Sequence, residues 1–200
     1  LHTNNHSQYS LLAMGNPYFE TEKKKSFWDQ FASIIKYRAI FRGDNLQQLP
    51  NAETEVIKIA ENFKNPTVCI GKQANEERFK QIASDFNIIH LATHFLVDDS
   101  QPMYSKIVLS QTDNECEDGF LQTYEIYNMR LNADMVVLSG CNTGMGALKR
   151  GEGLMGISRA FLYAGVPSII VSLWPVEDES TSVLMNRFYQ YLNKGYNKNR

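Results

Sequence analysis

The chain has 200 residues, of which 43% are hydrophobic, and a formal net charge of −2 at pH 7. This length suits one domain with a sizeable core, and the slightly negative charge argues against nucleic acid as the main ligand. No apolar run approaches the roughly 20 residues of a membrane span, and the polar first residues do not resemble a signal peptide, so we expect no membrane partner.

The first half of the chain alternates between strand and helix patterns. Residues 1–9 are polar and are expected to fray, and the apolar run after them predicts a strand at 10–14 that ends at Gly15-Asn16-Pro17. Phe27 and Phe31 keep near-helical spacing and indicate a helix with uncertain ends. The patterns that follow predict a helix at 51–63, a strand at 67–70, a helix at 75–86 and a strand at 88–92.

The second half continues the alternation after two polar segments. Residues 95–104 and 111–119 read as loops around a short strand at 107–109. The later patterns predict a helix at 123–127 capped by Thr123, a strand at 133–139, a helix at 154–164, a strand at 166–173, a helix at 180–192 and a tail at 196–200. Strand, helix, strand alternation predicts an α/β domain over residues 10–195 with a mostly parallel sheet.

Two strand ends carry candidate catalytic side chains. Cys141 follows an apolar run that has given way to Ser139-Gly140, and His94 follows the predicted strand at 88–92. The carboxyl edge of a parallel sheet is where ligands bind, so a thiol and an imidazole there suggest a cysteine nucleophile and a histidine base. A buried cysteine is often only a core residue, and His90, inside its apolar run, is interpreted in that way as a core imidazole.

The other cysteines indicate a reducing compartment rather than further chemistry. The chain has three cysteines, an odd number, and Cys69 lies in an apolar run as a core residue would. Cys116 lies among acidic residues, which oppose formation of its thiolate, so we expect low reactivity. We therefore expect a cytoplasmic location.

A rival motif is the G-x-G-x-x-G pattern of Gly151, Gly153 and Gly156, which opens a helix as a dinucleotide fingerprint does. Eleven residues separate Ser139 from Gly151, whereas the fingerprint needs its glycines in the strand-to-helix turn. A nucleotide-binding α/β domain is therefore an alternative. Close packing of the helix on the sheet would explain the glycines without a ligand. No metal-binding spacing of Cys and His stands out, and we expect no cofactor.

Several motifs follow one another along the chain. They are His90-Leu91-Ala92-Thr93-His94, Leu138-Ser139-Gly140-Cys141-Asn142-Thr143-Gly144, Gly151-Glu152-Gly153 and Ser172-Leu173-Trp174-Pro175-Val176. In this order they resemble the CHAT domain, a caspase-like cysteine peptidase domain related to separases. The likeness runs from about residue 10 to 194.

This resemblance implies a caspase-like three-layer sandwich with about six strands, and a cysteine endopeptidase dyad of Cys141 and His94. It also implies an oxyanion hole formed by the backbone N–H groups of Cys141 and Phe95. The family commonly has glycine where this chain has Phe95, and a left-handed backbone there would cost about 1–3 kcal/mol. A catalytically weak interaction module is therefore a second alternative. Gly140, where the family often has alanine, is expected to be a mild change.

The resemblance also implies partners. The expected ones are a protein substrate, and a helical-repeat region or regulatory protein that switches the activity, in a prokaryotic defence setting. By likeness to separases, Glu177 and Asp178 would bind a basic side chain of the substrate. Alternatively, these carboxylates stabilise the N-terminus of the last helix, an effect worth about 0.3–1 kcal/mol each.

Overall fold

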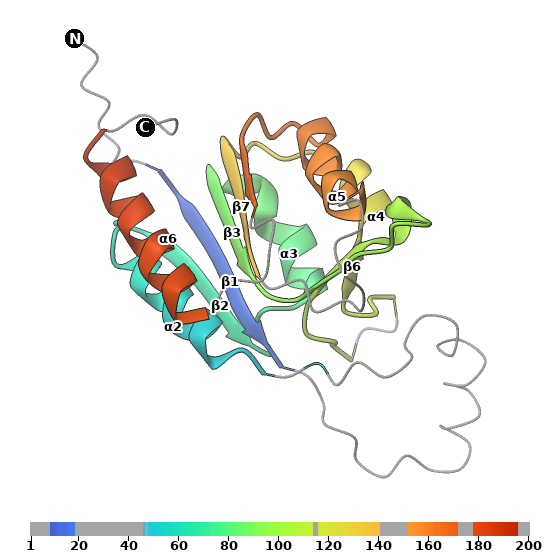
Figure 1. Cartoon of the computed structure of the whole chain (residues 1–200), viewed down its shortest axis with the longest axis horizontal. Coiled ribbons are helices and arrows are strands. Elements are labelled where there is room, and N and C mark those ends of the chain that lie inside the picture. The colour runs from blue at the N-terminus through green and yellow to red at the C-terminus, as the bar shows by residue number, and fades with distance from the viewer. Residues whose placement is uncertain are drawn as a thin grey trace.

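A computed structural model describes residues 9–18, 46, 48–113, 116–140, 152–171 and 178–195. Its centre is a parallel sheet of five strands in the order β2-β1-β3-β7-β8 (Figure 1). The strands are β1 (Leu11–Pro17), β2 (Pro66–Gly71), β3 (Ile88–Ala92), β7 (Met135–Ser139) and β8 (Ile169–Val171). The described residues thus form the expected α/β sheet with five strands in place of about six.

Helices cover both faces of this sheet. In Figure 1, α2 and α6 lie on one side of it, and α3 and α5 lie on the other. Side chains along β3 alternate between the two apolar cores, Ile89 and Leu91 in one and Ile88 and Ala92 in the other, as a strand buried on both faces must. The bounds are α2 (Pro50–Ala60), α3 (Glu76–Ile82) with the short helix η2 (Ala83–Asp85), α5 (Glu152–Tyr163) and α6 (Asp178–Asn193).

A second, antiparallel sheet extends from the end of β3. It has the order β4-β5-β6, and its first strand begins one residue after His94. The prediction of a loop over residues 95–104 is therefore wrong in part, because two residues are too short a run to show a period. The bounds are β4 (Phe95–Leu96), the short helix η3 (Pro102–Tyr104), β5 (Lys106–Val108), β6 (Phe120–Gln122) and α4 (Thr123–Tyr127).

The start of α4 corrects one predicted cap. Gln122 is the capping residue, and its side chain and that of Glu125 form a reciprocal capping box. The Thr123 hydroxyl instead donates to the Ser105 carbonyl oxygen at 2.8 Å and ties α4 to the segment before β5. The cap was misassigned because either polar residue fits the pattern at that position.

The other predicted helices and strands within the described residues are confirmed, with ends that differ by a few residues. The helix suggested by Phe27 and Phe31 lies outside the described residues. Within the described part of the chain, no helix combines the length and apolar character needed to cross a bilayer.

Candidate active site

The ends of β3 and β7 lie side by side at the carboxyl edge of the parallel sheet. Ala92 pairs with Ser139 in the register of the two strands. One residue later, the Thr93 N–H donates to the Ser139 carbonyl oxygen at 3.2 Å. Because the strands are parallel neighbours, the chain leaves both of them at the same place, where α/β sheets bind ligands.

Gly140 packs closely against the turn that follows β3. A Cβ atom at this position would lie 2.0 Å from the Thr93 carbonyl oxygen and 2.5 Å from a ring carbon of Phe95. Real Cβ contacts do not approach so closely, and the first of these neighbours is backbone that cannot swing aside. The expectation that glycine in place of alanine is a mild change is therefore wrong, because this packing admits only glycine.

His94 lies in a turn that the second sheet holds in place. Its side chain is buried, and its carbonyl oxygen accepts the Val108 N–H at 3.0 Å. The preceding Thr93 hydroxyl donates to the Val108 carbonyl oxygen at 2.6 Å. The Thr93 side chain and the His94 backbone are thus both bonded to β5, so the turn that carries the imidazole has little freedom to move.

Phe95 adopts its position without the strain that the sequence suggested. The only non-glycine residue with a positive φ among those described is Asn16, so Phe95 has an ordinary backbone conformation. No peptide bond in the described chain is cis. In a trans peptide unit the carbonyl and the next N–H point in opposite directions. Since the His94 carbonyl faces β5, the Phe95 N–H points away from β5.

The remaining predicted site residues stay predictions. Cys141 and Glu177 lie outside the described residues, as does Gly151. Asp178 is the first residue of α6, but its side chain is also outside the described part. The described residues therefore include His94 of the candidate dyad and, on the neighbouring strand end, Gly140, the residue before Cys141.

His90 is confirmed as a structural histidine. Its Nε2 lies 2.9 Å from Glu55 Oε1 and its Nδ1 lies 3.1 Å from the Tyr189 hydroxyl, with all three side chains buried. Burial, with the nearby Glu55, raises the pKa of Tyr189 well above its usual value, so Tyr189 is a neutral phenol that can donate to Nδ1. We assign the ring proton to Nε2, which then donates to Glu55. This network joins α2, β3 and α6.

The described glycines of the G-x-G-x-x-G motif are explained by packing. A Cβ on Gly153 would lie 2.3 Å from a methyl carbon of Val97, and one on Gly156 would lie 3.3 Å from Pro102. The Gly153 N–H, at the start of α5, donates to Asp99 Oδ1 at 3.1 Å. A carboxylate thus already occupies a donor that a nucleotide phosphate would need.

A charged cluster that the sequence analysis missed lies between α3 and α4. The Lys80 amine lies 2.9 Å from Glu76, 2.6 Å from Glu117 and 2.8 Å from Glu125. The oxygens of these three carboxylates lie within 4.8 Å of one another, which would suit a metal ion, but the amine already bonds all three. Only the i, i+4 spacing of Glu76 and Lys80 was visible in the sequence.

Burial perturbs this cluster. It raises the pKa of Glu76 to about 7; Glu125 and Glu117 push the same way, and Lys80 opposes them. Burial alone would lower the pKa of Lys80, but the three carboxylates outweigh it and raise that pKa above its usual value. With one amine among three carboxyl groups, a proton held by the most buried of them relieves the like-charge repulsion.

A model of the CHAT domain matches residues 2–200 of the chain. The chain belongs to the CHAT domain family. This is a caspase-like, peptidase-related family, and the CHAT fold here is the five-stranded parallel sheet with helices on both faces described above.

Two curated relatives match the CHAT chain in part. Tetratricopeptide repeat protein 28 of Mus musculus is 22% identical over 178 residues, and that of Homo sapiens is 24% identical over 178 residues. Each alignment covers 74% of this chain and 7% of the relative, so the chain spans a small fraction of their length. Among solved structures, a flavodoxin of Streptococcus pneumonia TIGR4 aligns with a TM-score of 0.47 at 10% identity, over 94% of this chain and 99% of that one.

Proposed function

We propose that this CHAT domain is a cysteine endopeptidase with Cys141 as nucleophile and His94 as general base. The observation that carries the proposal is the meeting of two strand ends, with Gly140 packed against the turn before His94. Cys141 follows Gly140 directly, and successive Cα atoms are about 3.8 Å apart. Gly140, the residue before the proposed nucleophile, thus lies against the turn that carries His94, which supports the pairing.

The proposed reaction has two steps. His94 takes the thiol proton, the Cys141 sulfur bonds to the scissile carbonyl carbon, and His94 returns the proton to the amine as the carbon–nitrogen bond breaks. Water, deprotonated by His94, then attacks the thioester, which releases the acid and restores the thiol. The N–H groups of Cys141 and Phe95 would stabilise the oxyanion. The orientation of the Phe95 N–H, away from β5, is compatible with this role.

For the substrate, we propose a protein segment with a basic residue before the cleaved bond, bound by Glu177 and Asp178. Its support is the position of Asp178 at the start of α6, although a carboxylate there also suits the helix dipole. We further propose that a helical-repeat region accompanies the domain, as the name of its curated relatives suggests. We also propose a cytoplasmic setting, with Cys69 buried as a reduced thiol.

The test is covalent labelling with a peptidyl chloromethyl ketone that carries arginine next to the reactive group, followed by peptide mass spectrometry. We expect a single adduct on Cys141, formed about 10²–10⁴-fold more slowly in His94→Ala. His6→Ala removes a histidine from the polar start of the chain and is the matched control, with an unchanged rate. Cys116→Ser should also leave the labelling unchanged.

Two results would overturn the dyad. One is an adduct spread equally over Cys69, Cys116 and Cys141, and the other is a Cys141 rate that does not depend on His94. Folded protein that no peptide electrophile labels would instead support the alternative of a CHAT interaction module without turnover.

A further inference from the structure

Large side chains of three neighbouring elements are exposed together on the side of the molecule that carries α4 and α5. They are Met103 and Tyr104 of η3, Tyr124 of α4 and Met155 of α5, with exposed fractions of 46%, 52%, 39% and 48%. The rings of Tyr104 and Tyr124 meet edge to face, with centroids 6.1 Å apart. We call these four residues the tyrosine surface.

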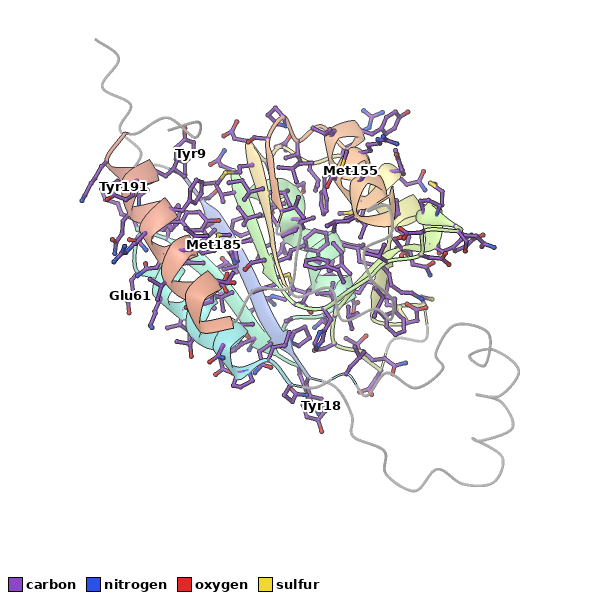
Figure 2. The ribbon with its side chains drawn as sticks, viewed as in Figure 1. Tyr9, Tyr18, Glu61, Met155, Met185 and Tyr191 are labelled. Atoms are coloured by element: carbon purple, nitrogen blue, oxygen red, sulfur yellow. The ribbon has the colours of Figure 1, made fainter. Side chains whose placement is uncertain are left out.

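The elements of this surface are in contact with one another. Gly156, the residue after Met155, lies against Pro102, the residue before Met103. The side chain of Thr123, the residue before Tyr124, is bonded to the chain just after Tyr104. Figure 2 shows Met155 on α5, on the opposite side of the sheet from Tyr191 and Glu61. The elements that carry the exposed residues therefore pack against one another.

Carboxylates surround the tyrosine surface. Burial raises the pKa of Tyr124, and the charges of Glu125 and Asp118 raise it further, which places both carboxylates near the ring. The charges of Asp118 and Asp98 both act on the amine of Lys106, so both carboxylates lie near it. A hydrogen bond from Ser100 helps to lower the pKa of Asp98, so Asp98 stays ionised. The charge that this patch offers to a partner is negative.

The described cations of this region balance only part of this charge: Arg159 is exposed one helical turn after Met155, and Lys106 is attracted by Asp98 and Asp118. The Lys80 amine is held by three carboxylates, which leaves that cluster with an excess of acid. Lys106 is almost fully buried, with its amine over the Phe120 ring at 4.9 Å. An approaching basic group would therefore meet tyrosine rings and carboxylates together.

We propose that the tyrosine surface docks an arginine- and lysine-rich segment of a partner protein. A guanidinium can stack on a tyrosine ring and bond a carboxylate at the same time, and the surface offers both groups side by side. The protein uses this chemistry elsewhere, because the Lys194 amine lies 5.6 Å from the Tyr191 ring centre and the Lys72 amine 5.4 Å from that of Tyr18. Nucleic acid and anionic membranes are disfavoured by the same carboxylates. This proposal does not depend on peptidase activity.

The test is equilibrium binding of fluorescent nona-D-arginine, which no peptidase cleaves, to the full 200-residue chain, measured by anisotropy at low ionic strength. We expect wild-type binding that weakens as salt rises, and no binding of nona-D-glutamate. The double variant Tyr104→Ala, Tyr124→Ala should bind about tenfold more weakly.

A second variant guards against loss of folding. Asp98 and Asp118 each accept backbone N–H groups through Oδ1, and Asn keeps that acceptor. The double variant Asp98→Asn, Asp118→Asn should therefore stay folded, as a cooperative thermal transition would show, and bind severalfold more weakly. Matched controls on the opposite side are Tyr191→Ala, which removes a ring that is 53% exposed, and Glu61→Gln. Both should bind as wild type does. Equal binding by all variants, or no wild-type binding at low salt, would overturn the proposal.

Discussion

The middle of β3 and its carboxyl end each carry a histidine, and the two have different surroundings. His90 and His94 are both buried, at 0% and 2% exposure. In the middle of the strand, the two nitrogens of His90 lie within hydrogen-bonding distance of Tyr189 and Glu55. At the end, His94 lies in a backbone turn held by β5, next to the end of β7. Burial alone therefore does not separate a structural histidine from a candidate catalytic one, whereas position relative to the sheet edge does.

The largest expected effect is on reactivity, in His94→Ala. A general base contributes about 10²–10⁴-fold, so the rate constant for alkylation of Cys141 should fall by that factor. The free energy of unfolding should change far less than in variants of His90. Stopped-flow alkylation and urea unfolding of the same samples measure both quantities. A variant that unfolds while its folded fraction still reacts at the wild-type rate would reverse the roles assigned to the two histidines.

The next effect is on stability, in His90→Leu. This substitution leaves the buried Glu55 carboxylate without its imidazole partner, and such a loss costs about 3–5 kcal/mol. Urea unfolding measures it. The double variant His90→Leu, Glu55→Leu removes the buried carboxylate together with its imidazole partner and should recover much of the loss, because apolar replacement of a buried polar pair is often neutral. A single variant as stable as wild type would show that the pair does not hold α2 to β3.

A smaller effect is expected from Gly140→Ala, which tests the contact between the two strand ends. The added methyl group would lie 2.0 Å from the Thr93 carbonyl oxygen, and overpacking of this kind costs about 1–3 kcal/mol. The midpoint of thermal unfolding and the rate of Cys141 alkylation should both fall. Gly156→Ala is the control, since its nearest neighbour would be Pro102 at 3.3 Å and alanine favours the helix. If both variants behave alike, the strand ends are not packed as described.

The remaining effect concerns pH, and it identifies a titrating group other than the histidines. The pKa of Glu76 is about 7 in the folded protein against 4.5 as its ordinary value, so the folded state holds a proton that the unfolded state releases. Its contribution to stability is therefore present below about pH 4.5 and is lost as the pH rises through 7. This window overlaps that of histidine. Urea unfolding between pH 5 and pH 8.5 should show that the free energy of unfolding falls more steeply with pH in wild type than in Glu76→Gln. Parallel pH dependences would exclude Glu76 as the titrating group.

Much of the fold followed from local pattern. The apolar run of β3 was predicted with its observed bounds, since a strand buried on both faces is uniformly apolar and its ends are abrupt. The second sheet was only partly visible, because β4 has two residues and β6 has three, too few for alternation to appear. The contacts of His90 with Glu55 and Tyr189 span 35 and 99 residues along the chain, and no local pattern reports such partners.

The candidate site, like the fold, could be predicted from the sequence only in part. That the strands carrying His94 and Cys141 end at one edge could be predicted, because parallel strands share their carboxyl edge. That neighbouring strands β3 and β7 are the two involved required the sheet order. The restriction at Gly140 came from the Thr93 carbonyl and the Phe95 ring, which lie more than forty positions earlier in the chain.

The most direct measurement of the central claim is a crystal structure of the chain after reaction with the peptidyl chloromethyl ketone. The account predicts electron density joining the inhibitor to Cys141 Sγ, a ring nitrogen of His94 within about 4 Å of that sulfur, and the inhibitor oxygen facing the Phe95 N–H. An inhibitor attached to Cys69 or Cys116, or a His94 ring turned away from Cys141, would contradict it.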